Sequence, residues 1–137
     1  MSISRRELAA IAAALAPARG QASALATKTY TWEQLPVKVN KQNRQRAIFD
    51  GRTRASFPIE MHETELEPGF APHGSHKHPN DEIFIVREGT IEADINGQKT
   101  TLSPGSVVWI NGGEEHGFRN SGSTRSRHYI IALGPKK

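Results

Sequence analysis

The strongest constraint on the fold is the regular alternation of short strand-like segments and turn signals from Phe57 onward. Short segments rich in β-branched and aromatic residues alternate apolar with polar side chains, and turn signals containing glycine, proline or asparagine separate them. Asn96-Gly97, between two such segments, is a strong signal for a two-residue hairpin. Many short strands at close spacing predict an all-β sandwich or barrel. The predicted strands cover residues 59–66, 82–86, 90–95, 98–102, 106–110, 116–120 and 125–133.

Three histidines and one glutamate in this region form a candidate metal site. His76 and His78 are one residue apart, so they lie on the same face if the segment is extended. Glu82 follows a predicted turn at residues 79–81, and His116 lies in a later polar, glycine-rich segment. If the strands bring these segments together, three imidazoles and one carboxylate converge on one point. The residues therefore predict a metal centre enclosed by the β-structure.

The types of side chain narrow the choice of metal. The chain contains no cysteine, which excludes disulfides, a thiolate nucleophile and cysteine-ligated zinc or iron–sulfur centres. Imidazole together with carboxylate suits iron, manganese, nickel, copper or zinc. Four protein ligands on an octahedral ion leave two positions for water, dioxygen or the oxygens of a substrate. The residues alone leave the identity of the divalent metal open.

Two spaced motifs contain these residues. In the first, Gly69 is followed by the histidine pair, then by Glu82 and finally by Gly89. In the second, Gly105 is followed by Asn111-Gly112-Gly113, then by His116 and Asn120. We expect the glycines to supply turns that need positive φ or close backbone approach, and Asn120 to close a turn through its side chain.

Together, the two motifs resemble those of the cupin superfamily. The sequence departs from the family pattern in having six residues, where five are usual, between Gly69 and His76, and in having Asn111 where proline is usual. The resemblance implies a small antiparallel jelly-roll barrel over residues 55–134, with His76, His78, Glu82 and His116 as metal ligands. It also implies a homodimer and a small-molecule ligand or substrate.

The first 26 residues predict an export signal. Arg5 and Arg6 precede an alanine-rich segment that is too short to span a bilayer, and small-x-small cleavage sites lie near Ala24 and Ala26. This pattern resembles a twin-arginine signal, although Glu7 is unusual there. It predicts a periplasmic or secreted protein with no membrane attachment after cleavage. The alternative is a surface helix capped by Ser4 and Glu7, in which case the protein is cytoplasmic.

Residues 27–54 predict an N-terminal arm of strand and loop. Residues 30–32 are a candidate edge strand, residues 41–46 a polar and basic loop, and Asp50-Gly51 a turn. The arginines of this region could meet an anionic surface or be solvated. Of the formal net charge of +4, the first 26 residues hold +2. The remainder is only mildly basic, which argues against nucleic acid as a partner.

Several other residues have alternative interpretations. His62, His73 and His128 can face the site or be satisfied or exposed elsewhere; Phe84 and Val86 can line a pocket or form core; Trp109 is expected to pack. Arg119, Arg125 and Arg127 can bind a carboxylate at the barrel mouth or be solvated. Glu114 and Glu115 are candidates for proton transfer or exposed turn residues.

Two functions fit this set of residues. The first is a metal-dependent enzyme acting on a small oxygen-rich molecule by dioxygenase, decarboxylase, lyase or isomerase chemistry, among which a shared fold cannot choose. The second is a non-catalytic module that binds a metal and a small ligand. Turnover by the metal-loaded protein would distinguish the two functions.

Overall fold

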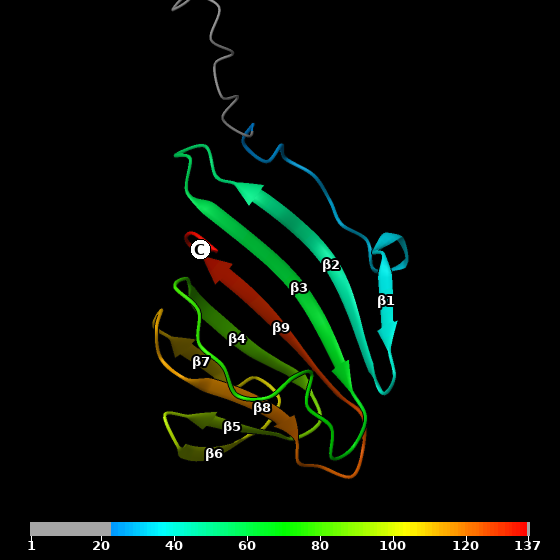
Figure 1. The fold of residues 1–137 in the computed structure, drawn as a ribbon. Helices are drawn as coiled ribbons and strands as arrows, with labels where there is room; N and C mark the ends of the chain where they lie inside the picture. The colour runs from blue at the N-terminus through cyan, green and yellow to red at the C-terminus, as the bar shows by residue number, and fades with distance from the viewer. Residues whose placement is uncertain (1–22, 137) are drawn as a thin grey trace, which may run out of the picture.

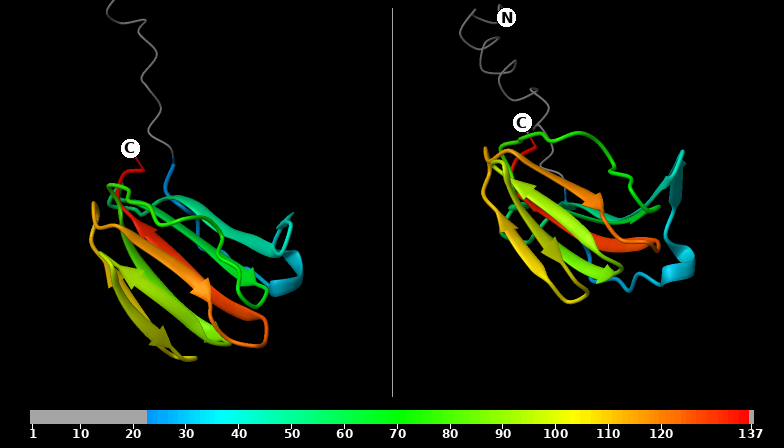
Figure 2. Two further views of the ribbon diagram at one scale, coloured as in Figure 1. Left: turned by 60° about the horizontal axis from the view of Figure 1, so that its bottom comes forward. Right: turned by 90° about the horizontal axis from the view of Figure 1, so that it is seen from below.

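A computed structural model describes residues 23–136, which form two antiparallel sheets facing each other (Figures 1 and 2). This architecture confirms the predicted all-β jelly-roll barrel. Residues 1–22, which include most of the predicted export signal, lie outside the described residues. Within the described part, no helix is long and apolar enough to cross a membrane.

The larger sheet has six strands in the order β1-β2-β3-β9-β4-β7, and the smaller has three in the order β6-β5-β8. A short 3-10 helix, η1 (Trp32–Gln34), precedes them. The strands are β1 (Val37–Asn40), β2 (Asn43–Arg52), β3 (Pro58–Leu66), β4 (Asp81–Glu88), β5 (Ile91–Ile95), β6 (Gln98–Leu102), β7 (Val107–Ile110), β8 (His116–Asn120) and β9 (Ser126–Leu133).

All the strands predicted from Ile59 onward are present: those at 98–102 and 116–120 have the predicted ends, and the ends of the others differ by at most two residues. Asn96 and Gly97 join β5 to β6, and both have positive φ, at 51° and 84°. This is the backbone that an Asn-Gly hairpin requires. The four motif glycines, at 69, 89, 105 and 113, also have positive φ, as expected.

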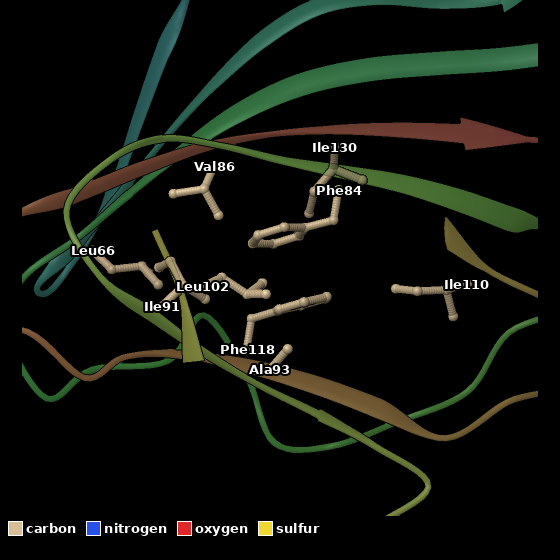
Figure 3. Close-up of a cluster of buried hydrophobic side chains, with 9 residues drawn as sticks. All are labelled: Leu66, Phe84, Val86, Ile91, Ala93, Leu102, Ile110, Phe118 and Ile130. Atoms are coloured by element: carbon tan, nitrogen blue, oxygen red, sulfur yellow. The ribbon is translucent and has the colours of Figure 1, made fainter. Parts of the chain in front are cut away.

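The hydrophobic core fills one part of the space between the sheets. Its side chains point toward one another from both layers in Figure 3, and Phe84 of β4 lies flat against Phe118 of β8 at 3.7 Å between ring centroids. Side chains alternate along β9, so every second residue, from Ser126 to Ala132, is buried. The core residues are Leu66, Phe84, Val86, Ile91, Ala93, Leu102, Ile110, Phe118 and Ile130.

Three expectations for the N-terminal region are wrong. Residues 30–32 are not an edge strand, because Trp32 begins η1. Residues 43–52 form the long strand β2 instead of a basic loop and a turn at Asp50-Gly51. Strand β2 pairs with β3 along its whole length, and this pairing with a distant segment outweighs the local turn and charge signals.

On the outer face of the larger sheet, an arginine of β2 pairs with two buried carboxylates of β3. Glu63 and Glu65 of β3 are buried there, and the guanidinium of Arg46 lies 3.2 Å from Glu63 and in contact with Glu65. Trp32 covers Arg46, whose guanidinium carbon is 4.2 Å from the ring centroid. A buried carboxylate needs such a cation nearby. The arm is thus fastened to the outer face of the sheet, opposite the interior.

Candidate metal centre

Backbone hydrogen bonds join the two segments that contain the histidines. His76 and His116 form an isolated antiparallel bridge in which each N–H donates to the other's carbonyl, at 3.0 and 2.8 Å. The N–H of Gly113 donates to the carbonyl of His78 at 2.8 Å. The loop before β4 is therefore bound to the start of β8 independently of any side chain.

Gly112 allows these segments to approach so closely. A Cβ built at this position would lie 2.1 Å from the carbonyl oxygen of Pro79, well inside contact distance. The N–H of Gly112 also donates to Oδ1 of Asp81 at 2.7 Å. A side chain here would push the loop after β7 away from the loop before β4.

The three histidines converge as predicted. One ligand atom from each of His76, His78 and His116 lies within 4.8 Å of the others. Glu82 on β4 faces the same point: its Oε1 is 3.0 Å from Nε2 of His78, and its Oε2 is 3.4 Å from Nε2 of His116. The structure thus brings all four predicted side chains together.

Two of the imidazoles are held in one tautomer by backbone carbonyls. Nδ1 of His78 is 3.0 Å from the carbonyl of Asn80, and Nδ1 of His116 is 2.9 Å from that of Glu114. A carbonyl can only accept, so each Nδ1 carries a hydrogen and each Nε2 faces Glu82. There Nε2 can carry a second proton and donate it to the carboxylate, or, in the neutral ring, offer its lone pair to a cation held between the two groups. Nδ1 of His76 is buried and has no hydrogen-bond partner among residues 23–136. Orphaned ring nitrogens around one carboxylate fit a bound cation.

The charges of the cluster are coupled. The hydrogen bond with Glu82 raises the pKa of His116, although burial opposes this. Burial raises the pKa of Glu82, but the hydrogen bond from His116 and the neighbouring histidines outweigh it and lower the pKa overall. Burial and the adjacent histidines lower the pKa of His76. Glu82 is therefore ionised, and it attracts either a proton on His116 or a metal ion.

The cluster opens into a cavity of about 220 Å³. Its buried wall comprises His116, Phe118, His128 and Ile130, whereas its exposed lining includes Gln45. The cavity therefore reaches from the mouth beside β2 to the inner surface of β9. The complete lining is Gln45, His62, Pro72, His73, His76, Glu82, His116, Phe118, His128 and Ile130.

The three histidines of undecided role all line this cavity. His73 is exposed and lies edge-on to His76, with ring centroids 4.1 Å apart. His62 is partly buried, and its Nδ1 is 2.8 Å from Oε1 of Glu60. His128 is fully buried, yet neither of its ring nitrogens has a partner among the described residues. Of the two alternatives given for His128, the structure therefore favours the one in which its side chain faces the cavity.

The candidate acids and arginines lie away from the cavity lining. Glu114 accepts from the backbone and side chain of Asn111, which makes it a turn residue, and Glu115 is exposed. Arg119 pairs with Glu92 at 3.1 Å. Arg125 pairs with Glu67, at 2.6 Å, and Arg127 with Glu65, at 3.4 Å.

The remaining expectations have mixed outcomes. Phe84 and Val86 are core residues. Asn120 closes its turn as predicted, accepting from the N–H of Gly122 and also donating to the carbonyls of Leu66 and Thr124. Trp109 was expected to pack but is 53% exposed, because it lies on the outer side of the edge strand β7.

Sequence reasoning missed Gln45. It pairs with Thr64 of β3, and its side chain reaches the cavity mouth from a region predicted to be a solvated loop. No local signal marks it, because its position depends on the register between β2 and β3.

Comparisons with known proteins agree with this architecture. A family model described as "Cupin domain" matches residues 62–132. An RmlC-like cupin from Shewanella frigidimarina is similar with a TM-score of 0.69 at 12% identity, over 82% of this chain and 95% of that one. A search of the curated proteins found none that matches the chain.

Two further similar structures are described as having activities. A predicted oxalate decarboxylase from Thermotoga maritima has a TM-score of 0.67 at 16% identity, over 79% of this chain and 100% of its own. The polyketide cyclase RemF from Streptomyces resistomycificus has a TM-score of 0.64 at 19% identity, over 79% of this chain and 80% of its own. At these identities the likeness shows the fold alone.

The coupling of His116 to Glu82 predicts a pH dependence of metal binding. We expect the affinity for Co²⁺ to weaken as the pH falls from about 8 to about 6, because the ion binds neutral imidazole and competes with the proton on His116. Because the pKa of His116 is raised, the weakening begins at a higher pH than for an ordinary histidine. Calorimetric titrations in buffers of different ionisation enthalpy measure both the affinity and the protons released. Constant affinity without proton release would contradict a ligand role for His116.

Proposed function

Because this chain belongs to the cupin domain family, we propose that it binds a divalent metal ion through His76, His78, Glu82 and His116. The metal residues border a cavity, so a small molecule in the cavity can reach the ion. We propose an oxygen-rich molecule, since hydroxyl and carbonyl oxygens suit the borderline metals that imidazole and carboxylate bind.

The observation that carries this proposal is the convergence of the three imidazoles on one ionised carboxylate. Glu82 supplies the negative charge, and the carbonyls of Asn80 and Glu114 hold the rings of His78 and His116 with Nε2 facing it. Such orientation by groups behind the ligands is typical of metal sites. A bound ion would supply Lewis acidity toward a substrate oxygen.

The cavity itself supports binding and orientation more than proton transfer. Of its lining residues, only Glu82 is a carboxylate, and that group is already placed beside the histidines. Phe118 and Ile130 give the inner wall an apolar surface that excludes water. The lining therefore offers residues that can hold a substrate in place, but it contains no carboxylate besides Glu82 that could transfer a proton.

Enzyme activity is the first of two candidate functions. The relatives described as a polyketide cyclase and a predicted oxalate decarboxylase make cyclisation or decarboxylation reasonable reactions to test first. The alternative is a module that binds metal and ligand without turnover. Loss of a phenolic, keto-acid or sugar substrate, or consumption of dioxygen, by the metal-loaded protein would favour the enzyme.

Metal analysis tests the site directly. We expect the protein purified without chelator to contain about one divalent ion per chain. The H76A and H116A variants should each lose most of it, and E82Q should weaken binding strongly because it removes the only negative charge of the cluster. K77A is the matched control, since Lys77 lies between the two histidines but is exposed. Unchanged metal content in H76A and H116A would end this assignment.

We further propose that the protein is exported through the twin-arginine pattern of its first residues. Changing both Arg5 and Arg6 to lysine should leave the protein in the cytoplasm, because this type of signal is read by its arginine pair. R19K, which alters a third arginine of the same segment, serves as the control. Cell fractionation measures the outcome. Normal export of the double variant would favour another route or the helix interpretation.

Finally, we propose a homodimer formed through the outer surface of β7. Val107 is 62% exposed and Trp109 is 53% exposed on this edge strand, a surface that a second copy of the chain would cover. Light scattering should give a dimer mass for the native protein and a monomer mass for W109E with unchanged metal content. A monomeric native protein would exclude this assembly.

A further inference from the structure

His128 occupies a position where an apolar residue would be expected. It lies at the middle of β9, between Thr64 of β3 and Val86 of β4, and its side chain faces the interior with 0% exposure. Its ring stacks on Phe84, with centroids 4.3 Å apart and planes at 23°. Its inward neighbour Ile130 belongs to the hydrophobic core. Phenylalanine or leucine would fill this space without a polar atom.

Both ring nitrogens of His128 lack a hydrogen-bond partner within residues 23–136. An unsatisfied buried polar group lowers the stability of the folded protein. Burial, with smaller contributions from His62 and His73, lowers the pKa of His128 to about 3. The ring is therefore neutral, with one nitrogen that donates and one that accepts. A buried group that lowers stability and makes no hydrogen bond within the described residues suits binding of a ligand.

His128 is separate from the metal residues but shares their cavity. The cluster of converging ligand atoms comprises His76, His78 and His116 and does not include it. The rings of His116 and Phe118 are 6.2 Å apart, and those of Phe118 and His128 are 6.5 Å apart, so Phe118 lies close to both imidazoles. A molecule bound to the ion at one end can thus extend along Phe118 toward His128.

The charged residues of the cavity lining limit which ionised groups a bound molecule can have. The lining contains no lysine or arginine, and its only carboxylate, Glu82, belongs to the metal cluster. Lys38 and Arg44 line a separate groove that shares Gln45 and His73 with the cavity mouth. An anionic group at the inner end would therefore be buried without a cation, which is strongly unfavourable. A neutral hydroxyl or carbonyl can bond to the imidazole at no such penalty.

We propose that His128 is a substrate-binding residue that hydrogen-bonds a neutral hydroxyl or carbonyl group of the ligand, at the end of the cavity remote from the metal. This inference rests on the proposed metal-binding function and names the ligand class: a small molecule with oxygens at both ends, whose inner end is uncharged. The cavity volume of about 220 Å³ is below the range of about 300–1,000 Å³ typical of drug-sized ligands. A single six-membered ring with polar substituents is the kind of molecule indicated.

Two pyranones that differ in one hydroxyl group test this assignment. Kojic acid chelates metals through its ketone and enol oxygens and carries a hydroxymethyl group across the ring; allomaltol has a methyl group in its place. We expect the metal-loaded protein to bind kojic acid about 2- to 12-fold more tightly than allomaltol, the effect of one ordinary hydrogen bond. The H128F variant should lose this preference while keeping its metal, and H128Q should retain part of it.

The stability of the H128F variant provides a second test, because replacing a histidine with a purely structural role would destabilise the protein. We expect H128F to unfold at the same urea concentration as the native protein or a higher one, because it removes an unsatisfied polar group. S126A is the matched control: Ser126 lies on the same face of β9 and its hydroxyl is also buried without a partner, but it does not line the cavity. S126A should therefore keep the preference for kojic acid.

Each contrary result has a distinct meaning. A marked fall in the stability of H128F, or a preference for kojic acid that survives in it, would overturn the role of His128. Failure of the metal-loaded protein to bind either pyranone would overturn the ligand class while leaving the metal site in place. A native protein that holds no metal would refute the proposed function itself.

Discussion

The candidate site depends on a backbone contact between two distant segments. His76 and His116 exchange a pair of backbone hydrogen bonds, and Gly112 lies against the carbonyl of Pro79. These contacts are made by main-chain atoms, so they bring the loop before β4 to the start of β8 whichever side chains project from them. The imidazoles are thus carried by a rigid junction between the two sheets, which is the preorganisation that a metal site requires.

The interior of the barrel is divided between two kinds of chemistry. One region is closed by apolar side chains, with Phe84 and Phe118 stacked at its centre (Figure 3). The other is lined by histidines, and His128 lies where the two meet, stacked on Phe84 but facing the cavity. Phe118 therefore packs in the core and also forms part of the wall against which a ligand would lie.

Local patterns predicted most of the barrel and the residues of the candidate metal site. Alternating strands, the Asn96-Gly97 hairpin and the glycines with positive φ are all decided by short-range sterics, which a sequence displays directly. The site could be predicted because its residues lie in two spaced motifs. Their convergence was an inference from those motifs, and the bridge between His76 and His116 gives it a physical basis.

Most of the failures come from long-range pairing, which the local sequence does not show. Arg46 belongs to a segment that looks like a basic loop, but its partners are Glu63 and Glu65 on the neighbouring strand. Gln45 reaches the cavity for the same reason, because the register between β2 and β3 sets its position. Trp109 looked like a core residue because hydrophobicity alone does not say which face of a strand is covered.

The alternation of side chains along β2 also disfavours pairing with β3 in a shifted register. Gln45 faces the cavity and Arg46 faces the buried carboxylates, so a slip of one residue against β3 would exchange them. A guanidinium would then enter the wall of the binding site, and Glu63 and Glu65 on the opposite face would lose one of their arginine partners. Both faces of the larger sheet would be destabilised by this slip. The pairing of β2 with β3 is therefore strongly favoured over a register shifted by one residue.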